Sequence, residues 1–96
     1  MTRDQRRLAA IVSADVVGYM RPRATANECL EAVRLARDQT RLQQAPAADL
    51  VTAAATLAKG LVSVVESSGL NPQRAEALDL LDNAGRAIGK ELRRRS

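Results

Sequence analysis

The side chains that could carry out chemistry in this chain are few, because it contains no His and a single Cys. Without His, the chain has no imidazole for acid–base catalysis, for activating a nucleophile or for binding a metal ion. Cys29 alone can form neither an internal disulfide nor a Cys-based zinc site. We expect Cys29 to be a small core residue on a helix face rather than a reactive thiol, because free Cys buries readily.

Carboxylates remain as candidate ligands for a cation. Asp15 stands within the apolar run Leu8–Val17, shortly before a glycine. Glu76, Asp79 and Asp82 form a second acidic group, but they lack a fourth ligand. We expect that group to be a solvated surface on the first half of a helix.

Positive charge gathers at both ends of the chain. Residues 1–23 carry five Arg against two Asp, and residues 86–96 carry five basic residues against one Glu. Such clusters can bind phosphates, anionic lipid or nucleic acid, but no aromatic residue lies among them to stack on bases. We therefore expect mostly solvated helix surfaces, with nucleic acid as a partner that is not favoured. The candidate anion-binding residues are Arg34, Arg37 and Arg41 on one side of a predicted helix, and Arg93, Arg94 and Arg95 near the C-terminus.

The elements that must position these residues are predicted to be helices from residue 24 onward. Thr25–Glu28 has the pattern of a helix N-terminus with a capping box, and apolar spacing continues to about Gln44. A second helix is expected from Pro46 and a third from the Asn71-Pro72 pair. Each has apolar residues at spacings of three and four.

The connection Gly69–Asn71 between the second and third predicted helices is short, which predicts an antiparallel hairpin. The fold class we expect is therefore all-α: a three-helix domain over residues 24–96, preceded by a short N-terminal arm at residues 1–23. Within the arm, residues 8–19 fit both a strand and a helix, and Val and Ile favour the strand narrowly. A single strand would need a partner chain.

The pattern Gly85-x-x-x-Gly89-Lys90 has some features of a phosphate-binding loop. It is one residue short of that motif, and Glu91 stands where the motif needs Ser or Thr. Because it also lies within a helical pattern, we interpret the two glycines as a notch that lets another helix approach closely.

The segment from Arg6 to Tyr19, RRLAAIVSADVVGY, resembles the opening strand of class III adenylate/guanylate cyclase catalytic domains, and is closest to the bacterial kind that begin with a basic pair. The resemblance implies a Mg²⁺ or Mn²⁺ ion held by the carboxylate of Asp15 and the backbone carbonyl of Val16. It ends at Tyr19, and the chain contains no Gly-Asp dipeptide to match the family's second metal-binding Asp. Because a two-metal site cannot be built from one carboxylate, we do not expect this chain alone to be a cyclase.

The function we expect is that of a small, non-catalytic helical interaction protein, cytoplasmic, with no resident cofactor and no membrane span. Its long Ala-, Leu- and Val-rich helices offer more apolar surface than one small chain can cover, which predicts a homo-oligomer or a helical partner protein. Two alternatives stay open: a component of a class III cyclase assembly, and a small basic nucleic-acid-binding protein. The predicted interface lies on the second and third helices and comprises Leu57, Leu61, Leu78, Leu81, Gly85, Ile88 and Gly89.

Overall fold

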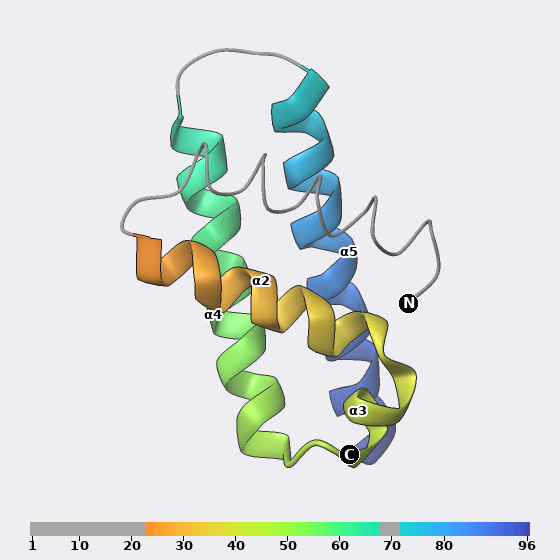
Figure 1. Cartoon of the computed structure of the whole chain (residues 1–96). Coiled ribbons are helices and arrows are strands. Elements are labelled where there is room, and N and C mark those ends of the chain that lie inside the picture. Colours follow the sequence, from red (N-terminus) through yellow and green to blue (C-terminus); the bar gives the residue numbers. More distant parts are fainter. Residues whose placement is uncertain (1–22, 68–71) are drawn as a thin grey trace.

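The computed structural model describes residues 23–67 and 72–96, and every regular element within those ranges is an α-helix (Figure 1). The predicted all-α class is confirmed. The predictions for Asp15, Val16 and the conformation of residues 8–19 fall outside the described residues. The helices are α2 (Arg23–Arg37), α3 (Gln39–Gln44), α4 (Ala47–Glu66) and α5 (Pro72–Arg95).

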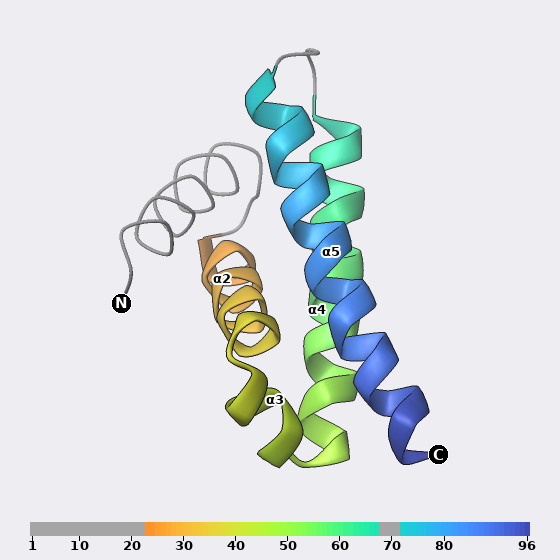
Figure 2. The same cartoon turned by 90° about the vertical axis from the view of Figure 1, so that its right-hand side faces the viewer.

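The two long helices α4 and α5 form the predicted antiparallel hairpin and share the most extensive contact between helices (Figure 2). Each buries one line of residues at spacings of three and four, which is the pattern of two helices packed side by side. The described core contains no aromatic side chain, so aliphatic residues, Ala and one Cys fill it. The buried lines are Leu50, Ala53, Leu57, Gly60 and Val64 on α4, and Ala77, Leu81, Ala84, Ile88 and Glu91 on α5.

The helix α2 lies across one side of this hairpin and contacts both α4 and α5 (Figures 1 and 2). Its buried side chains include Ala26, Cys29 and Val33. Cys29 has no exposed surface, and its thiol donates a hydrogen bond to the carbonyl oxygen of Thr56 on α4 at 3.4 Å. The prediction that Cys29 is a core residue is confirmed.

The prediction of one continuous helix over residues 25–44 is wrong, because Asp38 divides this segment into α2 and α3. Asp38 has an extended backbone, with φ −91° and ψ 99°, and its Oδ1 accepts hydrogen bonds from the amides of Thr40 at 3.1 Å and Arg41 at 3.2 Å. Asp is among the best N-cap residues, because its carboxylate satisfies amides that the first turn leaves unpaired. The chain changes direction here, and Leu42 on α3 is buried in the core.

Among the described helices, α4 alone is long and apolar enough to cross a membrane. The core helix of a soluble protein meets the same criterion, and α4 supplies a complete line of core residues. The expected absence of a membrane span therefore stays a prediction.

Candidate functional site

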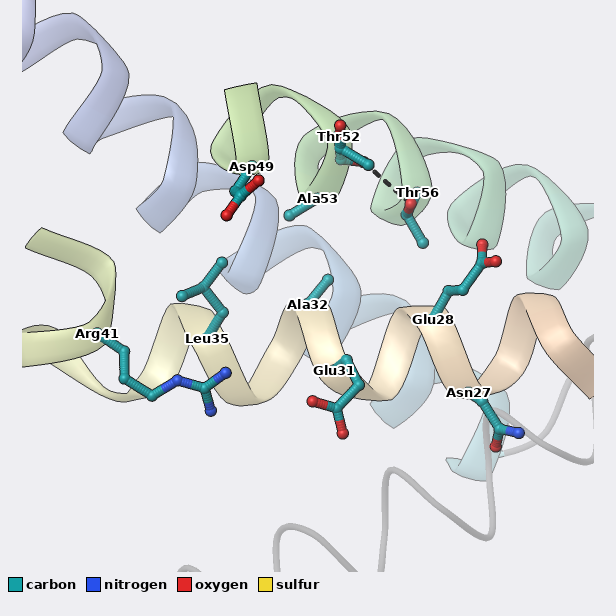
Figure 3. Close-up of a pocket in the computed structure, with 10 residues that line it drawn as sticks. All are labelled: Asn27, Glu28, Glu31, Ala32, Leu35, Arg41, Asp49, Thr52, Ala53 and Thr56. Atoms are coloured by element: carbon teal, nitrogen blue, oxygen red, sulfur yellow. Dashed lines mark hydrogen bonds between the residues drawn. The ribbon is translucent and has the colours of Figure 1, made fainter. Parts of the chain in front are cut away.

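A first hollow, of about 570 Å³, lies between α2 and α4 (Figure 3). Its charged lining comprises the carboxylates of Glu28, Glu31 and Asp49 together with Arg41 from α3. These groups do not converge: Glu31 points away from α4 in Figure 3, and its carboxylate pairs with Arg34 at 2.6 Å. Within the described part of the chain, no three His, Cys, Asp or Glu side chains are placed to hold a metal ion.

The hydroxyl and thiol groups beside this hollow are not activated for catalysis. Thr52 Oγ1 donates to the carbonyl oxygen of Ala48 at 3.0 Å, and Thr56 Oγ1 donates to that of Thr52 at 2.9 Å (dashed line in Figure 3). A nucleophilic hydroxyl needs an adjacent base instead. Burial, and then the charge of Glu28, raise the pKa of the Cys29 thiol to about 11, so the thiol is neutral at pH 7. The first hollow therefore offers no nucleophile.

A second hollow, of about 700 Å³, lies where the end of α2, α3 and the last turns of α5 meet. Its charged lining is mainly basic: Arg37 from α2, and Lys90, Arg93 and Arg94 from α5. The fold thus joins parts of two arginine groups that the sequence separates, since Arg37 and Arg93 are 56 residues apart. The rest of the lining is Ala36, Gln39, Leu42, Gln43, Ala87 and Glu91.

Glu91 is the carboxylate in this second hollow, and its side chain is 7% exposed. Arg94 donates to both of its oxygens, at 2.8 and 2.6 Å, and Arg95 donates to one at 3.3 Å. The pKa of Glu91 is lowered to about 2, mainly by the hydrogen bonds from Arg94. Burial of the carboxylate acts in the opposite direction and raises this pKa, whereas the hydrogen bond from Arg95 lowers it further. Glu91 is therefore ionised at neutral pH, with its charge balanced by the two arginines.

Arg95 is used inside the fold. Its guanidinium donates to the backbone carbonyl oxygens of Leu42, Gln43 and Ala45 at 3.0, 2.9 and 2.7 Å. These carbonyl oxygens lie at the C-terminal end of α3. The helix itself supplies no amide donors to the last carbonyl groups of its chain segment. Arg74, at the other end of α5, likewise donates to carbonyl oxygens at the end of α4. We therefore correct the assignment of Arg95 as an anion-binding residue: its donors hold α5 to the α3–α4 connection.

The other predicted anion-binding arginines differ in their partners. Arg34 pairs with Glu31, and Arg94 pairs with Glu91. Arg37, Arg41 and Arg93 form no ion pair and no side-chain hydrogen bond within residues 23–67 and 72–96. Of these three arginines, Arg37 and Arg93 line the second hollow, whereas Arg41 lines the first.

The predicted interface residues lie mostly inside the chain. Leu57, Leu81 and Ile88 are at most 1% exposed, so they pack in the chain's own core and offer no surface to a second chain. We correct the interface assignment for these three residues. Leu61 and Leu78 are half-buried and pack against the same core.

Gly85 and Gly89 do not form a notch for another helix of the described fold. A Cβ atom added at either position would meet nothing within 4 Å. Each glycine therefore borders open space, so no helix of the described fold approaches it closely, and the notch for a helix of another chain stays a prediction.

An exposed line of apolar residues runs along the side of α4 away from α2. Val51, Val62 and Val65 are 56%, 55% and 57% exposed, unlike the buried leucines of the same helix. At roughly 100° per residue, this line points roughly 140° away from Thr56, which contacts α2. We call it the valine stripe; with two exposed alanines it comprises Val51, Ala55, Ala58, Val62 and Val65, at spacings of four and three.

Gly85 and Gly89 lie on the same side of the hairpin as the valine stripe. Each is two residues, or roughly 200° of helix, from Ala87, which lines the second hollow beside α3. Figure 2 shows α2 and α3 on one side of the hairpin, and no described helix on the other. We call the valine stripe and these two glycines together the uncovered face.

Comparison of the chain with protein-family models, with curated proteins and with solved structures finds no match. The cyclase-like segment at residues 6–19 stays a resemblance, since it lies outside the described residues. Function is therefore inferred from the two hollows and the uncovered face.

Proposed function

We propose that the chain is a small, non-catalytic helical protein that pairs with a second copy of itself through the uncovered face. The observation that carries this proposal is the valine stripe, an exposed apolar line on a helix whose other apolar line already forms the core. Contiguous exposed apolar surface on a small chain is typical of a protein contact. Burying the exposed half of each valine contributes about 1 kcal/mol.

The size of the uncovered face fits a small symmetric interface. α4 has 20 residues and is therefore roughly 30 Å long. A neighbouring helix at about 8–10 Å widens the face to roughly 20 Å. Each copy contributes roughly 600 Å², so a pair buries about 1,200 Å², which is at the lower end for stable protein interfaces. We expect a dimer that dissociates at micromolar concentration.

The valine stripe is suited to meeting its own copy. Val51 and Val65 each lie seven residues from Ala58. A two-fold axis at Ala58 would therefore bring Val51 against Val65 of the partner subunit in an antiparallel pair. Alanine at the centre lets the two helices approach closely, and the open glycines continue the surface onto α5. The valine stripe itself contains no charged residue that would have to lose its water.

Sedimentation equilibrium from low-micromolar to several hundred micromolar concentration tests the pairing. The native chain should pass from 10.3 kDa to twice that mass. Val62→Glu should stay monomeric, because pairing would bury an unpartnered carboxylate in the stripe.

The matched control is Asn83→Glu, which adds the same charge at an exposed position of α5 outside the uncovered face. This variant should dimerise like the native chain. A 10.3 kDa species at every concentration of the native chain, or equal dimerisation of Val62→Glu, would contradict the proposal.

A further inference from the structure

The second hollow has the size and charge of a site for a small anion. Its volume of about 700 Å³ falls within the range of roughly 300–1,000 Å³ that small-molecule sites occupy. Four basic side chains line it against a single carboxylate. They come from helices that are distant in sequence, so the fold itself creates the cluster.

Three of the four cations have no carboxylate partner in the described parts of the chain: Arg37, Lys90 and Arg93. The carboxylate in the lining, Glu91, is already bound by Arg94 and Arg95, at 2.6 and 3.3 Å. Its single negative charge is therefore taken up by Arg94 and Arg95 and does not offset the charges of Arg37, Lys90 and Arg93. The field in the hollow is positive, which favours an anion with several charges.

Neutral groups in the lining support the same ligand. Gln39 and Gln43 of α3 carry side-chain amides, each of which can donate two hydrogen bonds. Ala36 and Leu42 supply the apolar part of the lining. Guanidinium groups donate hydrogen bonds in a fork that matches the oxygens of a phosphate group.

We propose that this hollow binds an oligophosphate, either inorganic polyphosphate or the phosphate chain of a nucleotide. Recognition is through the phosphates, because the lining contains no aromatic side chain on which a base could stack. The site is independent of the proposed pairing, since it lies on the α2 and α3 side of the hairpin, away from the uncovered face.

Isothermal titration calorimetry of the full chain with tripolyphosphate, ATP, orthophosphate and adenosine tests the site. Tripolyphosphate and ATP should bind with similar affinity, orthophosphate should bind about tenfold more weakly because it reaches fewer cations, and adenosine should not bind. Arg37→Gln and Arg93→Gln should each weaken tripolyphosphate binding about tenfold, which is the loss expected for a charge-assisted hydrogen bond.

The matched control is Lys59→Gln, which removes the same charge from an exposed position of α4 outside the hollow. Lys59→Gln should leave tripolyphosphate affinity unchanged. Val62→Glu, which should prevent dimerisation, should also leave this affinity unchanged, because the hollow does not depend on the pairing of two copies. Absence of tripolyphosphate binding, or equal loss in Lys59→Gln, would overturn the proposal. Binding of ATP without tripolyphosphate would also overturn it, in favour of a nucleoside site. Tighter binding of a single-stranded oligonucleotide, weakened equally by Lys59→Gln, would replace it with an extended nucleic-acid surface.

Discussion

The two faces of the α4–α5 hairpin are made by the same helices but bury very different amounts of apolar surface. On the face covered by α2, Leu57 is 1% exposed, and the buried Cys29 thiol has a hydrogen-bond partner on α4. On the uncovered face, the valines of the same helix are more than half exposed. A helix that is apolar on two sides needs a partner on each side, and in the described part of the chain α5 and α2 cover only one side of α4.

The two faces also differ in the size of their side chains. The covered face combines Leu57, Leu81 and Ile88 with small residues such as Ala and Gly, whereas the residues assigned to the uncovered face are Val, Ala and Gly. Small side chains leave a flat surface that a second helix can approach closely. In a single chain the exposed valines contribute little to stability and have a weaker helix propensity than Leu or Ala. These differences support the proposal that the uncovered face serves association between copies.

The largest expected effect comes from truncating a residue of the covered face. Leu57→Ala should lower the free energy of unfolding by about 2–5 kcal/mol, because it leaves a cavity between α2, α4 and α5. Val62→Ala, on the same helix but in the valine stripe, should change it by less than about 0.5 kcal/mol. Urea unfolding at low-micromolar concentration, where the chain is monomeric, measures both. Equal losses for the two variants would remove the distinction between the faces.

A second prediction concerns acid and the buried carboxylate at the end of the covered face. The pKa of Glu91 falls from its ordinary 4.5 to about 2 in the folded chain. The folded state thus binds the proton more weakly than the unfolded state does. The ionised carboxylate therefore stabilises the folded state, and this contribution to the free energy of unfolding is complete above pH 4.5. It should be lost as the pH falls from 4.5 through 2.

Thermal unfolding followed by circular dichroism between pH 7 and pH 2 measures this contribution. Glu91→Gln should unfold at a lower temperature than the native chain at pH 7, and the difference should shrink towards pH 2. Glu76→Gln, at an exposed position of the same helix, is the matched control and should not show this convergence. A difference for Glu91→Gln that is constant with pH would mean that its carboxylate charge is not responsible.

A third prediction compares two arginines that are two residues apart in sequence. Arg95→Ala should lower the free energy of unfolding by about 1–2 kcal/mol, because three carbonyl oxygens at the end of α3 lose a charged donor that is 26% exposed. Arg93→Ala should leave stability nearly unchanged but weaken tripolyphosphate binding. Urea unfolding and calorimetry on the same samples separate these roles. A stability loss in Arg93→Ala would indicate that its side chain also supports the fold.

Much of the covered face could be predicted from the sequence, because a helical period identifies both long helices and a short connection makes them antiparallel. The burial of Cys29 could be predicted from its residue type, because free Cys buries readily. The break at Asp38 could not be read from the apolar pattern, since Leu35 and Leu42 keep a helical spacing across it. The signal was the residue type itself, because Asp competes with the helix for its own backbone amides.

The position of the proposed interface could not be predicted, because the apolar residues of α4 extend around more than half of the helix. Periodicity indicates a helix that is apolar on more than one side, but the packing of α5 and α2 decides which line becomes core. The second hollow was hidden for a related reason. Arg37 and Arg93 come together in this hollow only after α2 and α5 have packed. The guanidinium of Arg95 instead donates a hydrogen bond to a backbone carbonyl oxygen 50 residues away in sequence.

The smallest expected effect distinguishes folding from association at the two open glycines. Gly85→Ala and Gly89→Ala should each raise the free energy of unfolding of the monomer by about 0.5–1 kcal/mol, because alanine favours the helix and its Cβ meets nothing within 4 Å. If a second copy packs against the uncovered face, the same methyl groups should hinder its approach and raise the dimer dissociation constant. Urea unfolding at low-micromolar concentration gives the first quantity, and sedimentation equilibrium gives the second. Stabilised monomers that also dimerise less would assign the glycines to the contact between copies. Destabilised monomers would instead show that the fold of one chain requires them, and the uncovered face would then stop at the valine stripe.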